Sequence, residues 1–215
     1  MNLFSPDSKL IRFLNWVADV VFVNLLYLLC SLPILTIGPA RAALLSVGRK
    51  WAKRQQSGGG DFIKAFLSGF RSAFPHWIPV LLSGLLLAFG IYIMCLNTLP
   101  AELLLWLLIC PVTVLYLMVY SQFFMVEAHF TCSFLQSIKL SLLCALGHPL
   151  RSAAVLVVQA VPLIVFLWQP MMFMDMSPMW FFLYFSIDGF MCANLCSKPF
   201  TRLLDRLGME EPCEE

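Results

Sequence analysis

Two aspartates interrupt stretches of the chain that are otherwise long and apolar. Asp19 is the only charged side chain between Phe13 and Ile37, and Asp188 is the only one between Met179 and Ser197. A charged side chain in the middle of a membrane span costs about 2.5–3.5 kcal/mol on insertion scales, so it usually faces protein or water and has a partner. Each aspartate therefore marks a candidate polar site.

Both aspartates are followed by an asparagine, Asn24 in the first stretch and Asn194 in the last. Counted from the outer ends of two upright helices at 1.5 Å per residue, Asp19 and Asp188 lie at matched depths of roughly 12–14 Å. Helices in contact would then form a polar seam of these four residues. Such a seam could hold a shared proton, a cation or sugar hydroxyls.

The same polar residues have a purely structural interpretation. Polar pairs between membrane helices stabilise packing by about 0.6 kcal/mol on average. Arg12, Asn15 and Asp19 also share one helix face, so Arg12 could neutralise Asp19 locally. Both interpretations stay open at this point.

Other motifs predict no enzyme chemistry. The chain has no P-loop, no GxGxxG, no HExxH and no Ser/His/Asp set, so no catalytic residue is predicted. Cys192 and Cys196 share a helix face without a nearby third ligand, and His76 and His148 read as helix-end residues, so no metal site is predicted. No cofactor is expected.

The composition defines the elements that must position these residues. Of 215 residues, 60% are hydrophobic and 12% are charged, whereas soluble domains carry about 25% charged residues. The pattern excludes a water-soluble globule and predicts an all-α, polytopic membrane protein with one domain over 1–208 and an acidic tail at 209–215. Apolar runs of sufficient length predict five spans, at about 11–35, 74–96, 103–126, 150–168 and 179–197.

The first stretch contains two expected helix breaks, at Pro33 and at Gly38-Pro39. Five full spans would leave the N-terminus outside and the C-terminus in the cytoplasm. The alternative is that residues 11–40 are re-entrant and turn at one of these breaks, which would leave both termini inside.

A basic segment, 41–72, follows the first stretch. It holds seven of the 14 Lys and Arg residues against one acid, while the loops at 97–102 and 169–178 have no Lys or Arg. The positive-inside rule places this segment in the cytoplasm of a plasma-membrane protein. Its composition predicts two amphipathic helices in the interface, with a lipid or partner contact at Arg49, Lys50, Lys53 and Arg54. Nucleic-acid binding is not expected.

The pattern D-x4-NLLYLLCSLPILTIGPA at 19–40, followed by D-F-x-x-A-F-x-x-x-F at 61–70, resembles the YesL-like family of bacterial integral membrane proteins. Arg41 departs from the smaller residue expected after the G-P-A turn. Members are often encoded beside carbohydrate ABC transporters, and the family brings no established catalytic residues. The resemblance thus implies a non-enzymatic component that assists carbohydrate uptake, in contact with a permease or ATPase subunit. The rivals are a small transporter or channel using Asp19 and Asp188, and a sensor acting through 41–72.

Overall fold

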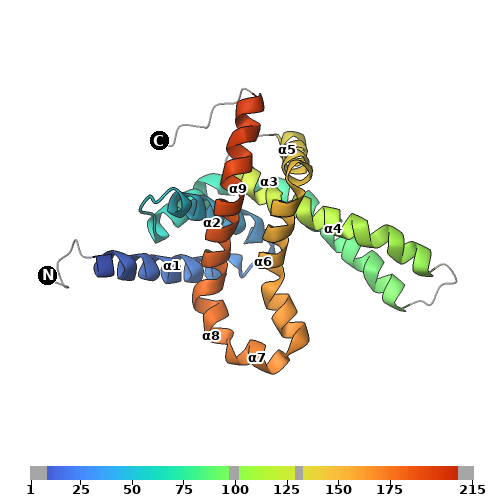
Figure 1. The fold of residues 1–215 in the computed structure, drawn as a ribbon, viewed down its shortest axis with the longest axis horizontal. Coiled ribbons are helices and arrows are strands. Elements are labelled where there is room, and N and C mark those ends of the chain that lie inside the picture. The colour runs from blue at the N-terminus through green and yellow to red at the C-terminus, as the bar shows by residue number, and fades with distance from the viewer. Residues whose placement is uncertain (1–8, 97–101, 129–132, 208–215) are drawn as a thin grey trace.

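The computed structural model describes residues 9–96, 102–128 and 133–207, and over these residues the backbone forms helices and no strand. The predicted acidic tail at 209–215 lies outside the described residues. The elements (Figure 1) are α1 (Lys9–Ser31), η1 (Ile34–Thr36), α2 (Ile37–Ala52), α3 (Gly59–Leu96), α4 (Glu102–Glu127), α5 (Phe134–Gly147), α6 (Pro149–Trp168), α7 (Pro170–Asp175), α8 (Ser177–Met179), the π-helical turn η2 (Trp180–Tyr184) and α9 (Phe185–Leu207).

Five stretches are long and apolar enough to cross a membrane, as the hydropathy predicts. They are 10–31, 59–96, 105–127, 149–168 and 177–196. The second is longer than expected, because the amphipathic stretch at 61–73 continues into the span as one helix through Pro75 and Pro79. At about 1.5 Å per residue, this helix is roughly twice as long as a bilayer core about 30 Å thick.

The predicted break at Pro33 is confirmed, since α1 ends at Ser31 and the chain turns through η1 into α2. The predicted break at Gly38-Pro39 is wrong. Both residues lie in the first turn of α2, where a proline does not cost a hydrogen bond because the first N–H groups have no intrahelical acceptor. A side chain at Gly38 would clash with the Trp77 ring, 2.5 Å from the ideal Cβ position.

The centre of the protein is α2, which is a correction to the predicted interfacial helix. Eleven of its 16 residues are buried, and it packs most extensively against α9 and α3. Small residues such as Ala40, Ala43 and Gly48 let neighbouring helices approach closely. The apolar residues of this segment predict a helix in the membrane interface. In the structure they belong to a helix that is enclosed by protein.

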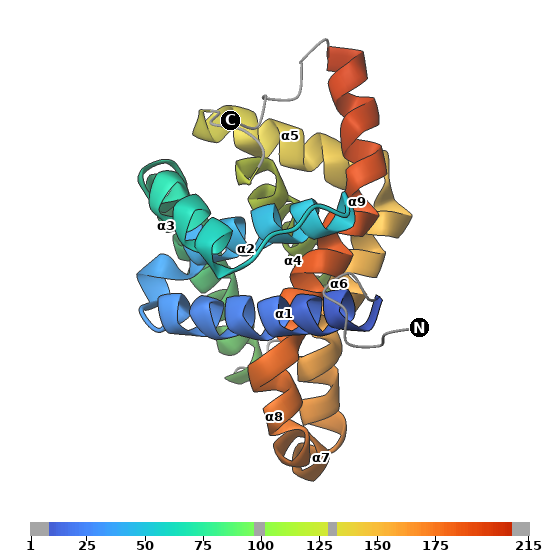
Figure 2. The same ribbon diagram turned by 90° about the vertical axis from the view of Figure 1, so that its left-hand side faces the viewer.

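The long helices do not all run in one direction. α1 and α2 form an antiparallel hairpin that lies crosswise to α9, as both views show (Figures 1 and 2). The hairpin of α6 and α9 and the hairpin of α3 and α4 project from the α2 region in separate directions (Figure 1). α1 and α9 therefore meet at one crossing and do not lie along each other.

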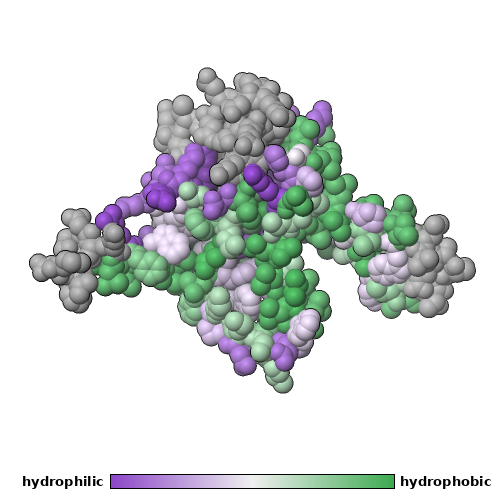
Figure 3. Space-filling view, viewed as in Figure 1, coloured by the Kyte–Doolittle hydropathy of each residue, from purple (hydrophilic) through white to green (hydrophobic). Residues whose placement is uncertain are grey.

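Large apolar side chains point outward from these projections. Leu29, Leu86 and Phe89 are each more than 60% exposed, and hydrophobic residues cover the projecting arms in Figure 3. Hydrophilic residues gather on the upper part of that face. An apolar surface of this extent is stable only against other apolar groups, so the chain is an integral membrane protein.

Candidate functional site

Asp188 forms a buried ion pair at the centre of the protein. The Nη2 atom of Arg41 on α2 lies 2.6 Å from its Oδ2 atom, and the two side chains are 12% and 3% exposed. The Cys192 thiol donates a hydrogen bond to Oδ1 at 3.2 Å. The partner that a buried aspartate requires is thus Arg41.

The environment of Arg41 explains why this pair holds. Burial is the largest single influence and by itself lowers the pKa of the guanidinium, but the charge and hydrogen bond of Asp188, together with Tyr27 and Cys192, raise the pKa of Arg41 overall. Removing one member would leave an uncompensated charge in the core, at a cost of about 3–5 kcal/mol. The pair therefore fixes α2 against α9.

Two glycines allow α2 and α9 to come this close. An ideal Cβ on Gly48 would lie 2.6 Å from the backbone oxygen of Gly189, and one on Gly189 would lie 3.1 Å from Cγ of Leu44. The crossing is therefore a backbone-to-backbone contact. Gly48 lies two helical turns from Arg41 on the same face of α2.

Asn24 joins α1 to the start of α9. Its amide nitrogen donates to the Phe181 oxygen, and its Oδ1 accepts from the backbone N–H of Ser186 at 2.9 Å. Phe181 belongs to the π-helical turn η2, where the regular i→i−4 pattern is interrupted. Asn24 satisfies groups that this interruption leaves available. Asn24 thus contacts the last span, and its partners there are backbone groups and not a second polar side chain.

Asp19 lies elsewhere, so the structure does not assemble the four-residue seam. It lines an open pocket of about 820 Å³ between α1 and the loop that follows α2. The matched depths assumed that α1 and α9 stand side by side, whereas they cross. Asn194 lies exposed on α9, six residues beyond the ion pair.

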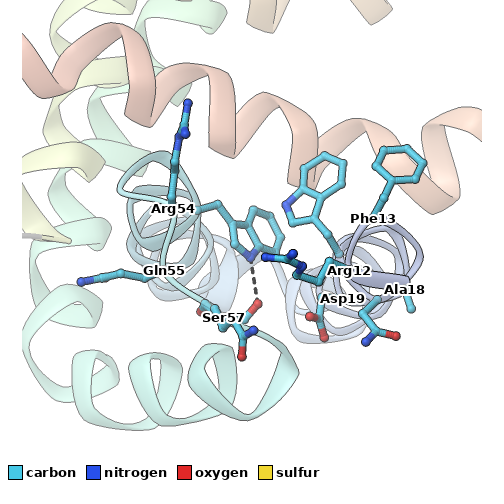
Figure 4. A pocket seen from close by; sticks show the side chains of 11 residues that line it. Arg12, Phe13, Ala18, Asp19, Arg54, Gln55 and Ser57 are labelled. Atoms are coloured by element: carbon cyan, nitrogen blue, oxygen red, sulfur yellow. Dashed lines mark hydrogen bonds between the residues drawn. The ribbon is translucent and has the colours of Figure 1, made fainter. Parts of the chain in front are cut away.

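Residues from both ends of the α1–α2 hairpin line this pocket (Figure 4). Arg12 and Asp19 come from α1, and Arg54 comes from the loop. The Trp16 and Trp51 rings meet edge to face with centroids 6.4 Å apart. The remaining lining residues are Phe13, Asn15, Ala18, Gln55, Gln56 and Ser57.

A rigid turn supports the loop side of the pocket. The N–H of Gln55 donates to the Lys50 oxygen and that of Arg54 to the Trp51 oxygen, both at 2.9 Å, which is the pattern of a Schellman C-cap. Arg54 occupies the position that glycine normally takes and has a φ of 60°. The Trp51 indole N–H then donates to the Ser57 oxygen at 2.8 Å and closes the loop.

The four basic residues predicted to contact a partner separate into two kinds. Arg49 is 7% exposed within α2, and Lys50 forms an ion pair with Asp61 at 3.3 Å. Lys53 and Arg54 lie exposed on the loop. Of these four residues, the two accessible ones are therefore those on the loop.

Sequence reasoning missed two side-chain pairs. Arg41 was counted with the interfacial basic residues, although an aspartate buried in an apolar span requires a cation from somewhere in the fold. His76 and Glu127 also meet, with Nδ1 and Oε1 3.0 Å apart, where the middle of α3 contacts the C-terminal end of α4. Their distance of 51 residues in sequence conceals this pairing.

Chemically, the two places differ. The Arg41–Asp188 pair is enclosed and charge-balanced, which suits a fixed joint between helices. The Asp19 pocket is open and presents charges of both signs, amides and indole rings, which suits ligand binding.

Comparison with known proteins finds one matching family model. No curated protein and no solved structure matches the chain. Residues 20–98 match the model of a family described as "Protein of unknown function, DUF624", which YesL-like proteins carry. The matched region runs from within α1 through α2 and α3, and so includes Asn24, Arg41 and the loop at 53–57.

Proposed function

We propose that the chain is a non-enzymatic membrane component that assists carbohydrate uptake by contacting an ABC-type permease or its ATPase subunit. The DUF624 match agrees with the resemblance to YesL-like proteins, from which the link to carbohydrate transporters comes. The observation that supports the proposed contact is the exposed loop at 53–56, in which Arg54 has a strained backbone conformation beside a polar pocket.

The conformation of this loop is the main argument. A non-glycine residue in the left-handed region costs about 1–2 kcal/mol, and Arg54 is the one described non-glycine residue that adopts it. Strain of this kind persists where surrounding structure enforces it, and it concentrates at sites of function. Buried Trp51 and Ser57 hold the two ends of the loop, so Lys53, Arg54 and Gln55 form a preorganised polar surface.

The α1–α2 hairpin also indicates on which side of the membrane the N-terminus lies. Because α1 and α2 are antiparallel, Arg12 lies beside the loop at 53–57 in one pocket. The two expected orientations differ at this point, and the geometry favours the one with the N-terminus on the side of the basic loop. Under the positive-inside rule that side is the cytoplasm, where an ATPase subunit would be accessible.

The pocket supports a second candidate function, a membrane sensor. It adjoins the exposed loop, so a ligand bound between Asp19 and Arg54 would contact the partner-facing surface directly. The transporter alternative has less support, because Asp188 is already neutralised by Arg41.

The test is co-purification from native membranes in mild detergent, with quantitative mass spectrometry. The native chain is compared with a Lys53→Gln/Arg54→Gln variant and with a matched control, Arg71→Gln/Lys139→Gln, which removes two exposed charges from α3 and α5. We expect a transporter subunit with the native chain and the control, and much less with the loop variant. A native chain that is recovered alone would refute the accessory role.

A further inference from the structure

The pocket beside Asp19 lies where the exposed apolar face of α1 meets the basic end of the hairpin. Arg12 is in the first turn of the candidate span that begins at Leu10. Phe13 and Leu14 beside it are 59% and 54% exposed, and exposed apolar side chains of an integral membrane protein face acyl chains. The pocket therefore opens toward lipid at the level where headgroups begin.

We propose that this pocket binds the headgroup of a phospholipid that carries a primary amine, of the phosphoethanolamine type. The Asp19 carboxylate accepts hydrogen bonds from the ammonium group. The guanidinium of Arg12 contacts the phosphate, and Arg54, whose side chain points away from Arg12 and Asp19, adds a more distant positive charge at the rim. This site shares Arg54 with the proposed transporter contact, but it does not rest on that contact, because lipid binding is measured with the chain alone.

The charge pattern of the lining selects this headgroup. Two guanidinium groups and one carboxylate line the pocket, and Figure 4 shows the Arg12 and Asp19 side chains together on the α1 side, with Arg54 on the loop side pointing away from them. A purely anionic headgroup would meet repulsion from Asp19. An ammonium with three N–H donors can satisfy a carboxylate, and an indole face such as that of Trp16 attracts a cation.

Local packing fixes the position of Asp19. An ideal Cβ on Gly58 would lie 2.8 Å from the Oδ1 atom of Asp19. Because Gly58 has no side chain, the Asp19 carboxylate can approach the loop backbone. Trp51 is buried and anchored to Ser57, which gives the pocket a rigid floor. The volume of about 820 Å³ is within the usual range for a small-molecule site.

The first experiment uses the native full-length chain in detergent, titrated with short-chain lipids and followed by native mass spectrometry. The lipids are phosphatidylethanolamine, phosphatidylcholine, whose amine has no N–H donor, and phosphatidylglycerol, which is anionic. We expect phosphatidylethanolamine to bind about tenfold more tightly than either of the others, as one charge-assisted hydrogen bond implies. Equal affinity for the three lipids would overturn the proposal without any variant.

The second experiment assigns the two charges. Asp19→Asn should remove the preference for phosphatidylethanolamine and strengthen phosphatidylglycerol binding, whereas Asp19→Glu keeps the preference. Arg12→Gln should weaken both lipids about tenfold. Asp175→Asn and Arg71→Gln make the same charge changes at exposed positions away from the pocket, and they should leave both affinities unchanged.

Two outcomes contradict the assignment. One is an Asp19→Asn variant that binds lipids no differently from Asp175→Asn. The other is a pocket occupied by a soluble hexose at millimolar concentration and by none of the lipids, which would make it a polyol site.

Discussion

Replacing Gly48 with alanine should destabilise the protein by forcing α2 and α9 apart. The new Cβ would lie 2.6 Å from the Gly189 oxygen and 2.7 Å from its carbonyl carbon. Both contacts are with backbone, which cannot move away as the tip of a flexible side chain can. The helices must separate by several tenths of an ångström, and that movement also stretches the Arg41–Asp188 ion pair on the same face of α2.

The magnitude follows from two opposing effects. Overpacking a well-packed contact costs about 1–3 kcal/mol. Removing a glycine from a helix interior returns about 0.5–1 kcal/mol. We therefore expect a net loss of about 1–2 kcal/mol in the free energy of unfolding.

The assay is thermal or denaturant unfolding in detergent, with Gly90→Ala as the matched control. Gly90 is also inside a long helix, but no atom lies within 4 Å of its ideal Cβ position. The control should be more stable than the native chain by about 0.5–1 kcal/mol, so the two variants differ in sign. A Gly48→Ala protein as stable as Gly90→Ala would refute the close crossing of α2 and α9.

Three further predictions follow from the same contacts. Arg41→Leu or Asp188→Leu alone should cost about 3–5 kcal/mol, while the double variant should recover most of this loss, because no unpaired charge remains; unfolding of all three variants measures the coupling. Arg54→Gly should stabilise the chain by about 1 kcal/mol, because glycine adopts a φ of 60° without strain. The same variant should reduce recovery of the transporter partner. A loss of stability would contradict the C-cap geometry. Single cysteines at Asn15 and Gln56, in a background without the native thiols, should react with an impermeant reagent from the same side of the membrane, and labelling from opposite sides would exclude the antiparallel hairpin.

The number and approximate positions of the apolar spans could be predicted from the sequence. Runs of about 20 apolar residues have few alternatives to helix in a bilayer, because every backbone polar group must be satisfied internally. Pro33 could be predicted as a break for a similar local reason, since proline removes a donor. The break predicted at Gly38 and Pro39 was wrong, because these residue types are also compatible with the start of a helix.

The burial of α2 could not be predicted, because it depends on residues far away in sequence. Hydropathy treats Arg41 and Arg49 as evidence of an exposed face. An arginine can be buried when a carboxylate faces it, and the carboxylate of Asp188 is 147 positions away. The small residues of α2 were the available signal, since Ala40, Ala43 and Gly48 are typical of close helix packing.

The candidate site shows how orientation decides what polar residues can do. Two upright helices would have brought Asp19 and Asp188 together along a common seam. In the structure α1 crosses α9, and the contacts at the crossing come from Trp16, Asn24 and Tyr27. Asn24 and Asp188 therefore fix α1 and α2 against α9. Their polar groups are paired with partners inside the protein. Asp19 instead lines an open pocket. Of the two aspartates, Asp19 is therefore the one whose charge is available to a ligand.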